Sequence, residues 1–348
     1  MNNPDAQISN RNLSVDTFRL LAALCVIILH LEYPALPRSF VIGMRLLSRW
    51  AIPFFFIVSG YYFAAQNTDM KRLNIQQMVG RLIWVFLLWS IIYAPVVADQ
   101  HDLKTVFQRF FSPNFIYFGN FLHLWFISSL VFGFVFIAFC YQFNIKFVLI
   151  FFSVTFLVIA LISRPYPIFK PGFPLEFGFA RHWLSVPFLY IGFYFYKKGF
   201  PSWWLSIILI VAGAASQAIE ARFIYRQYDI SAYDHEFLIG TIPFAIGITG
   251  LALNNLKWLQ QPLLSNWGRD YSLGIYLVHI LVIHIMTNWI YTILPGISGT
   301  MIWQALFPVI ILGLCILLFE VIRRWLPWLF NFLYGKHTLL HSLTKFFH

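Results

Sequence analysis

Long apolar runs recur along the whole of this chain and decide what it can fold into. An α-helix needs about 20 predominantly apolar residues to cross a bilayer, and ten runs come close to that length. Their approximate boundaries are 14–33, 40–65, 79–98, 121–141, 146–163, 182–197, 201–219, 236–254, 271–291 and 300–325. The sequence therefore predicts an all-α integral membrane protein with about ten transmembrane helices.

The composition agrees with a multi-pass membrane protein and excludes several other classes. Of the 348 residues, 60% are hydrophobic and only 11% are charged, whereas charged residues make up about a quarter of an ordinary soluble domain. A disordered chain, a disulfide-rich secreted protein and a cytosolic α/β enzyme are therefore excluded. We expect residues 1–348 to form a single membrane-embedded domain, with spans over about 14–325 and a basic amphipathic tail over 326–348.

Basic residues lie at the ends of the apolar runs rather than in one dense patch, although the net charge is +11. With the N-terminus in the cytoplasm, the inner segments hold thirteen basic and three acidic residues, against eight of each in the outer loops. Cytoplasmic loops of membrane proteins are enriched in Lys and Arg. We therefore expect both termini in the cytoplasm, a lipid bilayer as partner and no nucleic acid.

The first span carries ionisable side chains on one face. Arg19 and His30 are eleven residues apart, which is close to three turns and about 16 Å along the axis. Asp16 lies one turn before Arg19, and Ala23 and Val26 predict a low-profile groove between them. Charged groups inside a span are costly and often functional. The alternatives are an interfacial anchor for Arg19 and an ordinary interhelical hydrogen bond for His30.

The second and third spans add further candidates. Arg49 lies inside the second span and needs a partner or water, while Ser59-Gly60 is typical of close helix packing. Arg72 and Arg81 flank the inner end of the third span. They are either ordinary anchors or a seat for phosphate groups.

Later spans hold a second set of candidates. His123 and Trp125 open the fourth span on the outer side, where a Trp is normally an interfacial residue. Tyr276 and His279 share one face of the ninth span, and His279 is either an acid or base or a packing residue. The Pro-rich outer segment 164–181 is either a connector or a lid over an acceptor. No metal-ligand cluster is apparent in the sequence.

Four segments in this order resemble the acyltransferase-3 family of integral membrane acyltransferases. They are DTFRLLAALCVIILH, RWAIPFFFIVSGYYFA, HLWFIS and SLGIYLVHILVIH. Members commonly carry a basic residue, ten residues and then His in the first span, as Arg19 and His30 do, and Phe-Phe-x-x-Ser-Gly in the second, as residues 55–60 do. Where many members have Arg-x-x-Arg at the start of the third span, this chain has Met78 and Arg81.

The resemblance runs from Leu13 to Arg324 and is strongest to the branch that acetylates bacterial surface glycans such as enterobacterial common antigen. It implies an O-acetyltransferase of the bacterial cytoplasmic (inner) membrane, with acetyl-CoA as co-substrate and no metal. An acetyl group would pass to a hydroxyl of an extracytoplasmic glycan or lipid-linked glycan, with His30 as general base. The residues implied are, for catalysis, His30, Arg19, Asp16 and Arg49; for donor binding, Arg19, Arg72 and Arg81; for acceptor binding, His123, Trp125, Tyr276 and His279.

Proteins of other classes would use the same residues differently. A proton-coupled transporter of a glycan or small solute also needs intramembrane His and Arg, and a non-catalytic scaffold of the cell envelope is a third hypothesis. The sequence leaves open the acceptor sugar, transfer through an acyl-enzyme, and a homo-oligomer.

Overall fold

The computed structural model describes residues 11–67, 75–100, 103–163, 177–231, 237–293 and 295–335, and the regular elements in these ranges are all helices. Eight helical segments of the described chain are long and apolar enough to cross a membrane, which confirms an all-α membrane protein. Two shorter helices, α12 and α14, occupy the places of the other two predicted spans. The total of ten spans and the cytoplasmic termini stay predictions.

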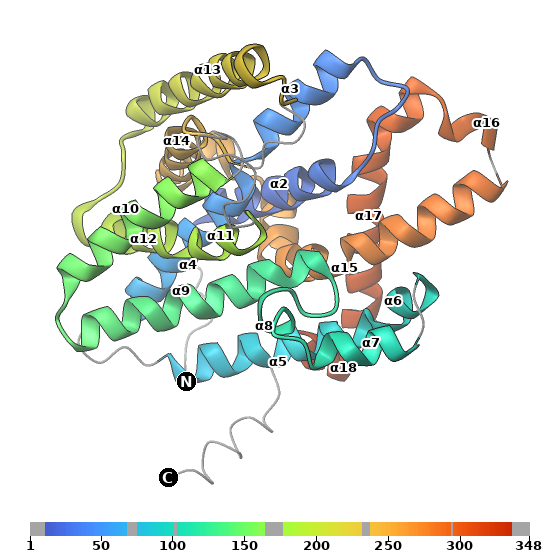
Figure 1. Ribbon diagram of the computed structural model, residues 1–348, viewed down its shortest axis with the longest axis horizontal. Coiled ribbons are helices and arrows are strands. Elements are labelled where there is room, and N and C mark those ends of the chain that lie inside the picture. The colour runs from blue at the N-terminus through green and yellow to red at the C-terminus, as the bar shows by residue number, and fades with distance from the viewer. Residues whose placement is uncertain are drawn as a thin grey trace, which may run out of the picture.

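The helices form one bundle in which α2 lies at the centre (Figure 1). In chain order they are α2 (Leu13–His30), α3 (Arg38–Ser48), α4 (Ala51–Gln66), α5 (Gln76–Ile92), α6 (Ala94–Gln100), α7 (Leu103–Phe110), α8 (Phe115–Phe118), η1 (Leu122–Leu124), α9 (Trp125–Gln142), α10 (Lys146–Ser163), α11 (Phe177–Trp183), α12 (Ser185–Lys198), α13 (Trp203–Tyr228), α14 (Thr241–Leu253), η3 (Lys257–Leu259), α15 (Pro262–Ile293), α16 (Pro295–Ser298), α17 (Met301–Trp325) and α18 (Pro327–Leu333).

Prolines divide two predicted spans into separate helices. A proline ring clashes with the carbonyl four residues earlier and removes a helical hydrogen bond. For Pro53 that carbonyl belongs to Arg49, where α3 gives way to α4, and for Pro187 it belongs to Trp183, the last residue of α11. The span predicted over 40–65 is confirmed as the apolar segment Arg38–Gln66, which is interrupted between α3 and α4.

Two helices are longer than their apolar runs. The span predicted over 201–219 is part of α13, which continues to Tyr228, and the span predicted over 271–291 is part of α15, which starts at Pro262. Hydrophobicity marks only the part of a helix that suits the bilayer, whereas the backbone hydrogen bonds continue into polar sequence. Proline is well suited to the first position of such a helix.

Glycines allow α4 and α12 to pack with their backbones in close contact. A Cβ atom at Gly60 would overlap the carbonyl of Leu189, and a Cβ at Gly192 would overlap that of Ile57. The assignment of Ser59-Gly60 to helix packing is confirmed for the glycine. Close approach of this kind is how helices associate in membranes, where helices and lipid are equally apolar.

A glycine also allows α2 to pack closely against α15. A Cβ atom at Gly268 would overlap the carbonyl of Asp16, and the hydroxyls of Thr17 and Ser265 are hydrogen-bonded across the interface at 2.8 Å. Asn12 caps the start of α2 by accepting a hydrogen bond from the backbone N–H of Val15, which satisfies one of the free donors of the first turn. The central helix is therefore fixed in register with α15.

Replacing Gly60 by Ala should destabilise the protein, because the new Cβ meets backbone that cannot rotate away. Overpacking of this kind costs about 1–3 kcal/mol, so we expect a lower unfolding temperature for the detergent-purified protein. Gly313→Ala in α17 is the matched control, since nothing lies near its Cβ position and Ala is the better helix former. Equal unfolding temperatures for Gly60→Ala and wild type would contradict the packing argument.

Candidate active site

Three histidines from distant parts of the chain meet in the bundle. His30 is the last residue of α2, His123 lies in η1 and His279 lies in α15. The ring centroids of His30 and His279 are 5.1 Å apart, and those of His123 and His279 are 5.6 Å apart. No group of His, Cys, Asp or Glu among the described residues is arranged to hold a metal ion. We call these three residues the histidine cluster.

The three rings differ in accessibility. His279 is 0% exposed and His123 is 3% exposed, whereas His30 is exposed. His30 keeps this exposed surface although its ring lies beside the buried ring of His279. A reactant can therefore contact the ring of His30, whereas the neighbouring rings of His123 and His279 are buried.

Hydrogen bonds fix the tautomer of His279. Its Nδ1 lies 2.7 Å from the carbonyl oxygen of Tyr276 and 3.2 Å from that of Ile275. Because a carbonyl oxygen can only accept, the neutral ring carries its proton on Nδ1. Its Nε2 is then an acceptor, and this buried atom has no hydrogen-bond partner within the described chain.

His123 is held by contacts that reach the same stretch of α15. Its Nε2 lies 3.3 Å from the carbonyl oxygen of Leu277 and so donates to it, which leaves the buried Nδ1 as an acceptor with no partner among the described residues. The hydroxyl of Tyr276 donates to the backbone carbonyl of His123, and Tyr93 donates to Leu277 at 2.9 Å. The cluster thus offers two buried acceptors, which a hydroxyl or a protonated His30 can satisfy.

Arg45 supports the end of α2 that carries His30. Its Nη2 donates to the carbonyl oxygens of Leu29 at 3.0 Å and Leu31 at 3.4 Å. A cation at the C-terminus of a helix satisfies free carbonyls and complements the helix dipole. Arg45 and Arg181 are the two positive charges that act on the His30 ring. The sequence analysis did not assign Arg45 to the site.

Arg181 in α11 is a second residue that the sequence analysis did not assign to the site. Its guanidinium lies over the rings of Trp125, at 5.4 Å, and Phe118, at 5.8 Å. The next residue, His182, donates from Nε2 to the carbonyl of Tyr117 at 2.6 Å. Trp125, expected at an acceptor site or the interface, thus holds Arg181. The one sequence feature that could have pointed to Arg181 is its position at the end of the Pro-rich segment 164–181.

Asp16 and Arg19 form a separate cluster at the other end of α2. Their side chains are bonded at 2.8 Å, and the Arg19 guanidinium lies over the ring of Tyr62 at 5.2 Å. The groove predicted along this face is wrong, because Ala23 and Val26 are only 1% and 2% exposed. Small side chains here let neighbouring helices pack closely, so no open channel joins Arg19 to His30 along α2.

The remaining predicted residues are dispersed. Arg81 donates from Nε to the carbonyl of Tyr334 at 2.7 Å, so part of its guanidinium holds the end of α18 in place. Arg49 is buried where α3 meets α4, and its catalytic role stays a prediction. Arg72 and the lid residues 164–176 lie outside the described residues.

A helical membrane bundle with one accessible histidine above two buried ones defines a membrane-embedded site suited to proton transfer. The model of the acyltransferase domain family, acyltransferase-3, matches residues 12–335. The chain therefore belongs to this family, as the sequence resemblance indicated.

Two curated proteins show more distant similarity. A serine/alanine racemase of Enterococcus gallinarum is 26% identical over 136 residues, which cover 35% of this chain and 19% of that protein. An amino-acid racemase of Enterococcus faecalis is 23% identical over 303 residues, which cover 80% of this chain and 42% of that protein. The chain thus spans less than half the length of these relatives. No solved structure matches it.

Replacing Arg45 by Gln should lower kcat for acyl transfer, because the end of α2 loses its cation and His30 shifts. A misplacement of about 1 Å can cost about 100-fold in rate. We expect the KM for the donor to change little and Arg45→Lys to recover part of the rate. The control is Arg38→Gln, at the exposed start of α3, the helix that also carries Arg45. A fall in thermal stability with unchanged kcat would contradict a positioning role.

Proposed function

We propose that this protein transfers an acetyl group from cytoplasmic acetyl-CoA to a hydroxyl of an extracytoplasmic glycan, free or lipid-linked, with His30 as general base. The observation that carries the proposal is the accessible His30 ring above two buried histidines, in a chain that belongs to a membrane acyltransferase family. The wider assignment to a bacterial inner membrane and a surface polysaccharide belongs to the same proposal.

The reaction needs one base and stabilisation of one developing negative charge. Neutral His30 takes the proton of the acceptor hydroxyl while its oxygen attacks the thioester carbonyl. The new C–O bond forms, the C–S bond then breaks, and the departing CoA thiolate takes the proton back from His30. Arg181, whose charge acts on this ring, is placed to stabilise the oxyanion, and a positive charge is worth most where water is excluded.

Two buried acceptor nitrogens lie beside the exposed ring of His30. Nδ1 of His123 and Nε2 of His279 have no hydrogen-bond partner among the described residues, and an unpaired buried acceptor costs about 1–3 kcal/mol. A protonated His30 therefore gains by donating to one of them, while the acceptor hydroxyl contacts the exposed side of His30. The acceptor-site roles of His123, Tyr276 and His279 stay predictions.

The donor binds from the opposite side in this proposal. The nucleotide of CoA is strongly anionic, and Arg19 lies at the end of α2 expected in the cytoplasm, where its partner Asp16 is also bonded to Arg11 at 2.7 Å. A donor phosphate can therefore replace Asp16 as the partner of Arg19, because the charge of Asp16 stays paired with Arg11. Because Ala23 and Val26 are packed, the thin pantetheine arm must reach His30 along a path other than this face of α2.

The His30→Ala variant tests the base. Purified wild-type protein in detergent is given radiolabelled acetyl-CoA and a bacterial envelope glycolipid extract, and labelled acceptor is measured. General base catalysis contributes about 10²–10⁴-fold, so we expect transfer to fall at least 100-fold while CoA binding persists. His284→Ala, on the same helix as His279 but paired with Asn288, should keep full transfer.

Full transfer by His30→Ala would remove the general-base role. Failure of the wild type to transfer acetyl to any glycan, combined with proton-coupled uptake of a solute into vesicles, would favour the transporter instead.

Donor binding by Arg19 predicts a salt-dependent affinity. Attraction between exposed charges is screened within a Debye length of about 8 Å at physiological ionic strength. We expect Arg19→Ala to weaken CoA binding severalfold at low salt and to make the affinity less sensitive to salt. Arg324→Ala, at the end of α17, is the control for general loss of basic charge. Identical CoA affinities of Arg19→Ala and wild type across salt would exclude this donor contact.

A further inference from the structure

The hydroxyl of Tyr93 bridges two backbone groups of α15. It donates to the carbonyl oxygen of Leu277 at 2.9 Å and accepts from the N–H of Leu281 at 3.3 Å. An unbroken α-helix joins these two groups directly, because each N–H donates to the carbonyl four residues earlier. A side chain inserted at such a point opens or bends the helix locally. His279 lies midway between the two bridged residues, so the insertion falls on the turn of α15 that carries this histidine.

The bridged carbonyl also holds His123. The carbonyl oxygen of Leu277 accepts from Nε2 of His123 at 3.3 Å as well as from Tyr93, and a carbonyl oxygen has two lone pairs for two such bonds. Both donors lie outside α15, so they draw this carbonyl away from the helix axis. The rings of Tyr93 and His123 also pack edge to face, with their centroids 4.7 Å apart. One hydroxyl thus acts on the backbone around His279 and on the hydrogen-bond partner of His123.

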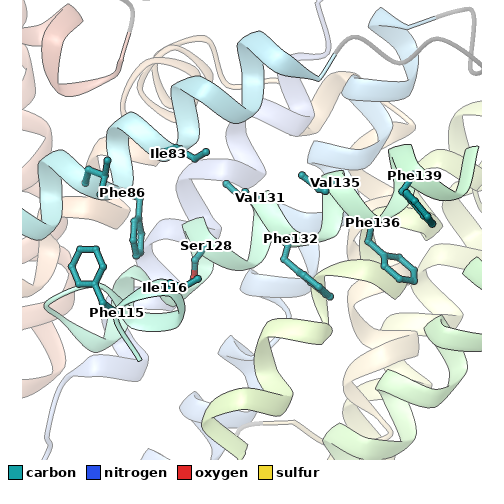
Figure 2. Close-up of a pocket in the computed structure, with 11 residues that line it drawn as sticks. Ile83, Phe86, Phe115, Ile116, Ser128, Val131, Phe132, Val135, Phe136 and Phe139 are labelled. Carbon is teal, nitrogen blue, oxygen red and sulfur yellow. The ribbon is translucent and has the colours of Figure 1, made fainter. Parts of the chain in front are cut away.

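Neighbouring contacts fix Tyr93 in place. Tyr93 directly follows α5 and is fully buried. The chain that leads into η1 is bonded to the same helix, since Asn120 donates from Nδ2 to the carbonyl of Ser90 at 3.0 Å. Figure 2 shows a further contact between α5 and this part of the chain, the packed rings of Phe86 and Phe115, whose centroids are 5.6 Å apart. The hydroxyl therefore cannot move away from α15 without disturbing these contacts.

We propose that Tyr93 is a positioning residue for the transfer reaction, whose hydroxyl holds α15 open so that His123 and His279 are oriented beside His30. The inference rests on the proposed function and adds a residue that contacts neither substrate, because its side chain is fully buried. Packing alone would account for a buried aromatic ring at this position but not for a hydroxyl with two backbone partners. A phenylalanine would fill the same space and let the backbone bond of α15 close.

The Tyr93→Phe variant tests the inference, because it removes the hydroxyl and keeps the ring. The N–H of Leu281 can then donate to the carbonyl of Leu277, so no buried backbone group is left unpaired and the protein should stay folded. The bond from His123 to that carbonyl weakens, and the histidines shift. Since a displacement of about 1 Å can cost about 100-fold in rate, we expect kcat for acetyl transfer to fall about 10–100-fold, with an unchanged KM for acetyl-CoA.

Two comparisons distinguish positioning from general destabilisation. Tyr271→Phe is the matched control, because Tyr271 is a buried tyrosine of α15 whose hydroxyl donates to Glu320 rather than to the backbone of the helix. We expect this control to keep the wild-type kcat. Residues that act as a unit have non-additive effects on rate, so the rate losses of Tyr93→Phe and His279→Ala should combine to less than their product in the double variant.

The outcomes separate this inference from the proposed function. Wild-type kcat in Tyr93→Phe, an equal loss in Tyr271→Phe, or fully multiplicative losses in the double variant would overturn the positioning role while leaving acetyl transfer established. Failure of Tyr93→Phe to fold would also overturn it, because the inference requires that the ring without its hydroxyl suffices for folding. No acetyl transfer by the wild type to any glycan would instead overturn the proposed function.

Discussion

Close packing of α2 against α15 is the constraint on which the candidate active site depends. Asp16 meets Gly268 at one end of the pair and His30 meets His279 at the other, so the two helices run parallel and in fixed register. Any side chain at position 268 would push the backbones apart. The distance between the two histidine rings is thus set by a glycine about three turns away from them.

The bilayer favours backbone carbonyls as partners for the buried groups of this site. Few charged groups are tolerated within the hydrocarbon region, and His123 and His279 bond instead to carbonyls of α15 near Tyr276. Uncharged groups contact the positive charges close to His30: the carbonyls that end α2 accept from Arg45, and aromatic rings lie under Arg181. Ion pairs with carboxylates are found instead around Asp16 at the opposite end of α2.

The sequence was a good guide where the physical signal is local. Apolar runs located the helices, because a span must be apolar over its own length. An ionisable residue in such a run is conspicuous, which is why His30 and His279 could be named. The sequence could not show that Arg45 reaches back to Leu29 or that Trp125 lies under Arg181, because both contacts depend on how separate helices pack. Ala23 and Val26 show the same limit: small residues suit an open groove and a tight interface equally, and here they form the interface.

In the proposed reaction, the tautomers of the buried histidines determine how a protonated His30 is stabilised. A histidine that accepts a proton becomes a cation, which in most enzymes is stabilised by a neighbouring carboxylate. In this cluster the Nδ1 of His279 is committed to backbone carbonyls, so its Nε2 faces the reaction as a neutral acceptor. A newly protonated His30, 5.1 Å away between ring centroids, can donate to that nitrogen after a small ring rotation. The positive charge is then shared with a neighbour that was neutral beforehand.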